Sequence, residues 1–120
     1  MMQDFRQIKV WGKAHALTLS IYEITARFPA DERFDLTSQI RRAAISVGAN
    51  LAEGAGRGTD ADFARFVQLA MGSASEVESL LLVARDLHFI PDTRHAELEA
   101  GITEVKRMLA AFLKKLRAEG

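Results

Sequence analysis

One stretch of the chain, from Gln39 to Arg57, constrains the fold more than any other. It reads QIRRAAISVGANLAEGAGR, and its small residues and helical spacing predict one α-helix that ends in a glycine-rich turn. At about 100° per residue, its apolar side chains fall on two separate faces. One face comprises Leu36, Ile40, Ala44, Val47 and Leu51, the other comprises Ile45, Ala49 and Ala52, and a polar line of Gln39, Arg42, Ser46, Asn50 and Glu53 lies between them. We therefore expect this helix to pack on two sides.

Two prolines and a cluster of glycines divide the chain into four predicted helices. Pro29 and Pro91 each stand where a helix should end, and the glycines at 54, 56 and 58 supply the remaining break. No segment alternates with period two over the length of a strand. The predicted helices span residues 11–28, 37–54, 60–88 and 93–118.

Several residues at the ends of these predicted helices are typical of helix caps. Thr37 or Ser38 is expected to cap the second helix, and Thr59 the third. Gly54 is expected to end the second helix in a left-handed conformation with positive φ. His88 is expected at the end of the third helix, where a cation is favoured.

Each predicted helix carries an apolar stripe that suits a shared core. The clearest stripe is in the last helix, where the apolar residues alternate steps of four and three: Leu98, Ile102, Val105, Leu109, Phe112 and Leu116. Short connections favour up-down-up-down order. The prediction is therefore an all-α chain that folds as one domain, residues 1–120, into an antiparallel up-down-up-down four-helix bundle.

The first three helices carry more apolar surface than one bundle is expected to bury. The surplus residues are Trp11, His15, Leu19, Tyr22, Ile45, Ala49, Ala52, Leu80 and Val83. Large exposed apolar patches usually mark an interface, so these residues predict a homo-oligomer. The alternative is that the geometry of the bundle hides them within one subunit.

The composition excludes several kinds of chemistry. The chain has no cysteine, which excludes disulfides, thiolate metal sites and cysteine nucleophiles. Its three histidines stand on separate predicted helices, and no Glu-x-x-His pair of the kind found in di-metal bundles occurs. The serines have no evident histidine partner. We therefore expect no enzymatic activity, no cofactor, no metal and no small-molecule substrate.

Charge and hydropathy bear on partners and location. Sixteen basic and sixteen acidic side chains cancel, so net charge alone does not favour binding to nucleic acid. The first residues are too polar for a signal peptide, and no apolar run approaches the roughly 20 residues that span a bilayer. We expect a cytoplasmic protein without a membrane partner.

The polar residues near the signature stretch have two interpretations. Asn50 and Glu53 of the second helix, with Glu76 and Glu78 of the third, are either a catalytic carboxylate site or a buried hydrogen-bonded network. Buried charges are tolerated when they are paired, and Arg42 and Arg57 lie in the same stretch. We favour the network.

The last helix carries a basic segment without acidic residues between positions 105 and 117. Its five cations are Lys106, Arg107, Lys114, Lys115 and Arg117. On a monomer they are a solvated surface with cations at a helix C-terminus. Repeated by symmetry in a ring, they would form a belt that neutralises several phosphates, so they are the candidate nucleic-acid site.

The stretch Gln39–Arg57 resembles the signature of the four-helix-bundle proteins encoded within intervening sequences of bacterial 23S ribosomal RNA genes. The family pattern is approximately Gln-x-x-Arg-Ala-x-x-Ser-Ile-x-x-Asn-Ile-Ala-Glu-Gly-x-Gly-Arg. The residues that match are Gln39, Arg42, Ala43, Ser46, Asn50, Ala52, Glu53, Gly54, Gly56 and Arg57. The resemblance extends upstream to Trp11 and downstream to Glu76, and so covers nearly the whole chain.

The resemblance implies an antiparallel four-helix bundle that assembles as a ring, with five copies as the expected number. It implies no enzymatic activity. The family is similar to the accessory variability proteins of diversity-generating retroelements, which form pentameric barrels and bind nucleic acid. The signature is then a structural network for folding and assembly rather than an active site. We expect an oligomer that associates with RNA or another nucleic acid, and the alternative is a protein–protein interaction scaffold that binds no nucleic acid.

Overall fold

Four α-helices make up most of the chain, which a computed structural model describes over residues 3–119. They are α1 (Lys9–Thr25), α2 (Leu36–Ala55), α3 (Asp60–Asp86) and α4 (Asp92–Glu119), with short 3₁₀ helices η1 (Phe5–Gln7) and η2 (Ala30–Glu32) before α1 and α2. The first two residues and the last residue of the predicted 1–120 domain lie outside this description. For the described residues, the prediction of an all-α chain with four helices is confirmed.

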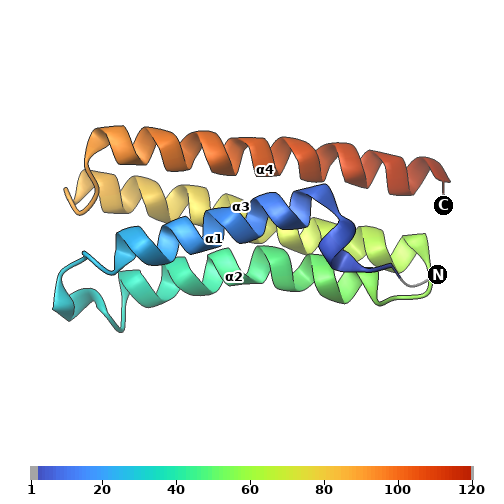
Figure 1. Ribbon diagram of the computed structural model, residues 1–120, viewed down its shortest axis with the longest axis horizontal. Coiled ribbons are helices and arrows are strands. Elements are labelled where there is room, and N and C mark those ends of the chain that lie inside the picture. The colour runs from blue at the N-terminus through green and yellow to red at the C-terminus, as the bar shows by residue number, and fades with distance from the viewer. Residues whose placement is uncertain (1–2, 120) are drawn as a thin grey trace.

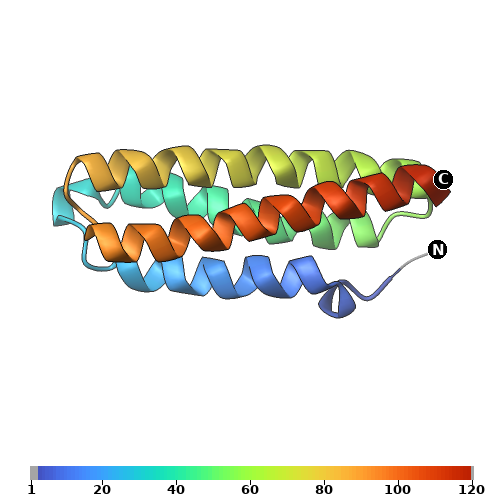
Figure 2. The same cartoon turned by 90° about the horizontal axis from the view of Figure 1, so that it is seen from above.

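The four helices lie side by side in an elongated body of 45 × 23 × 19 Å. The chain reverses direction at each connection, so the colours run in alternate directions along successive helices in Figure 1. Each helix contacts two neighbours, in the order α1, α2, α3, α4 and back to α1. Helices α2 and α4 therefore occupy opposite corners, an arrangement that Figure 2 shows from a second side.

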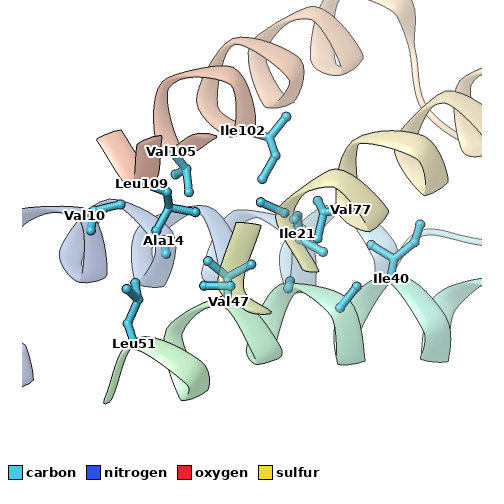
Figure 3. Close-up of a cluster of buried hydrophobic side chains, with 14 of the residues drawn as sticks. Val10, Ala14, Ile21, Ile40, Val47, Leu51, Val77, Ile102, Val105 and Leu109 are labelled. Atoms are coloured by element: carbon cyan, nitrogen blue, oxygen red, sulfur yellow. The ribbon is translucent and has the colours of Figure 1, made fainter. Parts of the chain in front are cut away.

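The core lies along the axis that the four helices surround. Figure 3 shows side chains from all four helices meeting there, including Ile21 of α1, Val47 of α2, Val77 of α3 and Leu109 of α4. The predicted inner face of the second helix is buried throughout, and so is the predicted stripe of α4 except for Phe112, which is partly buried. Each large apolar side chain buried in this way contributes about 1.5–3 kcal/mol to folding, and the core depends on their sum.

Helix α1 ends earlier than predicted, at Thr25 rather than at residue 28. The amides of Arg27 and Phe28 donate to carbonyls three residues back, at 3.2 and 3.1 Å. This tight turn is common where a helix stops. Pro29 is the physical reason, because a proline disfavours the helical conformation of the residue before it.

The start of α2 also differs from the prediction. The helix begins at Leu36, and neither Thr37 nor Ser38 caps it. Asp35 occupies the N-cap position without capping the backbone; its Oδ1 accepts a hydrogen bond from Nε2 of Gln39 at 3.0 Å. The side chain of Thr37 is buried. The predicted caps are wrong because Leu36 and Thr37 already belong to the first turn of the helix, where both side chains are buried.

The ends of α3 follow the predicted chemistry more closely. The hydroxyl of Thr59 accepts the amide of Asp62 at 3.1 Å, so its capping role is confirmed. At the other end His88 has φ 64°, in the left-handed region. The amide of His88 donates to Arg85 and that of Phe89 donates to Ala84, both at 2.9 Å. These two bonds form a Schellman motif, with histidine where glycine is usual.

Helix α3 contains a long apolar stretch. Among helices in residues 3–119, it alone is long and apolar enough to cross a bilayer by length and composition. The core helix of a bundle passes the same test, and α3 packs between α2 and α4. About a third of its most apolar window is buried within the chain, and Leu69 and Val83 stay exposed.

The positive φ of His88 leads to a prediction about stability. Replacing it with glycine (His88→Gly) should raise the free energy of unfolding by about 0.5–1 kcal/mol, because glycine adopts positive φ without the steric cost of a Cβ atom. Chemical denaturation followed by circular dichroism measures the change. His88→Ala keeps the Cβ atom and should give no such gain; equal stability of the two variants would contradict the prediction.

Candidate functional site

The signature stretch forms α2, and its glycines act differently from the prediction. Gly54 lies inside the helix, and no described glycine has positive φ, so the predicted left-handed cap is wrong. A Cβ atom on Gly54 would lie 2.7 Å from Cδ1 of Phe63 and 2.9 Å from Cβ of Phe66. Gly54 therefore allows α2 and α3 to approach closely. The helix ends instead at Gly56, whose amide donates to Ala52 and Glu53.

This close approach predicts a contrast between two glycines. Gly54→Ala should destabilise the protein by about 1–3 kcal/mol, because the two phenylalanines must shift to admit the methyl group. A Cβ atom on Gly72, in the exposed middle of α3, would meet nothing within 4 Å. Gly72→Ala should therefore stabilise the helix by up to about 1 kcal/mol. Unfolding curves of the two variants that shift in the same direction would contradict this account.

The polar line of α2 divides into separate groups. Oγ of Ser46 lies 2.8 Å from Oγ of Ser73 on α3, and Nδ2 of Asn50 donates to the carbonyl and the hydroxyl of Ser46 at 2.9 and 3.0 Å. These three side chains are half-buried. The bond between Ser46 and Ser73 links α2 to α3, and Asn50 supports Ser46 from within α2. These neutral hydrogen bonds satisfy polar groups inside an apolar contact.

The charged residues do not form the predicted buried network. Nη2 of Arg57 pairs with Oε2 of Glu53 at 3.0 Å, and both side chains are exposed. Arg42 and Glu76 are exposed as well. Glu78 pairs across the helices with Lys106. The network prediction is wrong for the charged residues, because their long side chains reach water, where an ion pair adds little stability.

The histidines and carboxylates do not converge on one place in the described structure. His15 stacks on Trp11, His88 forms the left-handed end of α3, and His95 is buried near the start of α4. No group of three potential metal ligands occurs among the described residues. A surface depression of about 510 Å³ contains Arg27, His88, Asp92 and Arg94, but it is open to solvent and its charges are mixed.

An apolar groove runs along the outside of α1 and α2. It has a volume of about 370 Å³ and is lined by Phe5, Trp11, His15, Thr18, Ile45, Gly48, Ala49 and Ala52; we name it the α1–α2 groove. The Trp11 ring stacks on His15 at 4.8 Å and meets the edge of Phe5 at 4.9 Å. A Cβ atom on Gly48 would lie 3.2 Å from the indole nitrogen of Trp11, so a small residue makes room for the indole.

The apolar surface continues beyond the groove along α1. Leu19 is 59% exposed, and Ile45 on α2 is 49% exposed. The guanidinium of Arg41 lies 4.4 Å from the ring centroid of Tyr22 and donates through Nε to Thr25 at 2.9 Å. The structure thus brings together the predicted interface residues of the first two helices on one surface.

A second apolar surface lies on α3. Leu69, Val83 and Leu87 are 48%, 43% and 51% exposed, and Leu80 is partly buried; we name these four residues the α3 ridge. Their steps of eleven, three and four residues keep them on one side of the helix. Leu80 and Val83 were predicted from the sequence, whereas Leu69 and Leu87 were missed although the same spacing includes them. Phe34, in the connection before α2, is almost fully exposed.

The predicted basic segment is partly neutralised by neighbouring acids. Nζ of Lys106 lies 2.9 Å from Oε1 of Glu78, and Arg107 makes two hydrogen bonds to Glu104, at 2.6 and 3.0 Å. The bonds from Arg107 lower the pKa of Glu104 and raise that of Arg107 itself. Lys106 and Arg107 therefore each already have a carboxylate partner within their own chain.

Three cations remain at the C-terminal end of α4. Lys114, Lys115 and Arg117 are exposed, and among the described side chains no carboxylate oxygen lies within 4.0 Å of their nitrogens. The structure thus reduces the predicted five-residue patch to a smaller cluster. This cluster also lies where cations stabilise the end of a helix.

These features define a class: a small all-α protein of four packed helices, with polar residues spread over its surface and two uncovered apolar surfaces. Residues 6–111 match the family profile of the 23S rRNA-intervening sequence protein, and the chain belongs to that family. The sequence resemblance to this family is confirmed.

A solved structure has the same fold. It is a protein of unknown function from the S23 ribosomal protein family of Bacteroides thetaiotaomicron, with a TM-score of 0.79 and 24% sequence identity. The match covers 88% of this chain and 98% of the other. At that identity the likeness concerns the fold alone. Among curated proteins, none matches the chain.

Proposed function

We propose that this protein is a non-enzymatic homo-oligomer, a ring of antiparallel four-helix bundles that binds RNA through the C-terminal end of α4. The observation that carries the assembly is the α1–α2 groove, an apolar hollow on the surface of the chain. The proposal includes the relation to the accessory variability proteins of diversity-generating retroelements, and with it five copies in the ring.

The size of the uncovered apolar surface supports self-assembly. Leu19, Ile45 and the α3 ridge leave about half of most of their large side chains in water, and covering the exposed half of one such side chain is worth about 0.7–1.5 kcal/mol. Apolar patches of this kind usually mark an interface. The chain has a formal net charge of zero, so its copies do not repel one another by net charge.

Light scattering of the purified protein tests the assembly. The expected mass is that of five copies of the 13.3 kDa chain. Ile45→Glu puts a charge in the groove and should reduce the mass to that of one chain, because an unpaired carboxylate is costly to bury. The matched control is Ala110→Glu on the exposed side of α4, which should keep the mass of the oligomer. A wild-type protein with the mass of one chain would contradict the proposal.

Three cations of α4 that have no carboxylate partner among the described side chains support the RNA part of the proposal. The neutral chain offers no general attraction to phosphates, so binding must rest on a local cluster. Lys114, Lys115 and Arg117 are such a cluster, and a ring repeats it once per copy. Phosphate contacts of this kind release counterions, so binding should weaken steeply as salt rises.

Binding to a fluorescein-labelled RNA hairpin, followed by anisotropy in about 50 mM salt, tests this part. A triple variant with Lys114→Glu, Lys115→Glu and Arg117→Glu should bind at least about tenfold more weakly than the wild type, because it removes the phosphate contacts. The salt dependence of the remaining binding should be shallower.

A control variant must have the same net charge. Arg27→Glu, Arg33→Glu and Arg85→Glu make the same charge change; the first two lie in the connection between α1 and α2, and the third lies at the end of α3. That connection and the end of α3 are at the end of the molecule away from the C-terminus of α4 (Figure 1). This variant should lose less affinity than the α4 variant. Equal losses would show a dependence on net charge alone. A stable oligomer that binds no RNA in low salt would favour the alternative, a protein–protein interaction scaffold.

A further inference from the structure

The two apolar surfaces lie on different sides of α2. The α1–α2 groove opens on the side of α1. Ser73 of α3 hydrogen-bonds to Ser46 of α2. Leu69 lies four residues before Ser73, and Leu80 lies seven residues after it. The α3 ridge is therefore on the side of α3 that lies next to α2. A self-assembling chain must therefore cover two separate surfaces.

We infer that neighbouring copies meet head to tail, with the α3 ridge of one copy seated in the α1–α2 groove of the next. This inference rests on the proposed self-assembly and states which surfaces carry it. The occupant of the groove is a second copy of this chain. A head-to-tail contact repeats around a closed ring, so one type of contact covers both surfaces on every subunit.

The shapes of the two surfaces suit one another. The groove is hollow because Gly48, Ala49 and Ala52 supply little side chain along the outside of α2. The ridge projects leucine and valine side chains from α3, and three of its four residues are close to half-exposed. A two-fold contact through the groove would instead place one hollow against another and leave the ridge in water.

Charge complementarity favours the same contact. The hydrogen bond between Ser46 and Ser73 places these residues at one level along the bundle. Helices α2 and α3 run in opposite directions, and each rises about 1.5 Å per residue. Arg42 stands four residues before Ser46, so it lies level with the residues about four positions after Ser73, which are those around Glu76. In a ring whose axis is parallel to the bundle, rotation from one copy to the next preserves these levels. Glu76, beside the ridge, is thus brought to the level of Arg42 in the next copy, and both side chains are exposed.

Two single variants test the inference. Ile45→Arg blocks the groove, and Val83→Arg blocks the ridge; both side chains are exposed, so the helical fold should persist in circular dichroism spectra. Each variant alone should have the mass of one chain by light scattering. An equimolar mixture should form a heterodimer of two chains and nothing larger, because only one intact groove and one intact ridge remain to pair.

Further measurements separate this inference from the proposed assembly. Mixing Ile45→Arg with Ala49→Arg, two groove variants, should leave only single chains. An oligomeric wild type whose Val83→Arg variant keeps its full mass would overturn the head-to-tail contact but not self-assembly. Two monomeric variants that fail to pair when mixed would also overturn it. A wild-type protein with the mass of one chain would overturn both.

Discussion

The close approach of α2 and α3 is the contact on which the rest of the structure depends. At one end Gly54 leaves no room for a Cβ atom against Phe63 and Phe66, and near the middle Ser46 and Ser73 share a hydrogen bond of 2.8 Å. Small residues let the two backbones come together, and short hydroxyl side chains satisfy each other there. The signature stretch is therefore a packing element first.

The close packing of α2 against its neighbours determines which apolar side chains stay outside the core. A helix that is apolar on two faces buries only one in its own core, and the second face of α2 becomes part of the α1–α2 groove. Helix α3 contributes to the core along its whole length and still leaves the α3 ridge uncovered. Both surfaces therefore follow from one arrangement, in which α2 lies at the corner opposite α4.

Electrostatics limits what the basic segment can do. Two of its five cations are held by Glu78 and Glu104, and the chain as a whole has no net charge. An isolated subunit thus offers three cations at one helix end. Symmetric repetition in a ring is the physical route by which so small a cluster could hold a nucleic acid, because affinity for phosphates grows with the number of contacts.

The sequence by itself determined the helices, the inner faces and the cap at Thr59, because these depend on periodicity and local hydrogen bonding. It also contained the family signature. It did not determine the role of Gly54, since the neighbouring Phe63 and Phe66 come into reach only when α3 folds back on α2. The pairing of Lys106 with Glu78 was hidden for the same reason: 28 residues separate them along the chain. Only the tertiary structure decided which charges are neutralised and which apolar side chains stay exposed, because both depend on distances between helices and not on spacing within one.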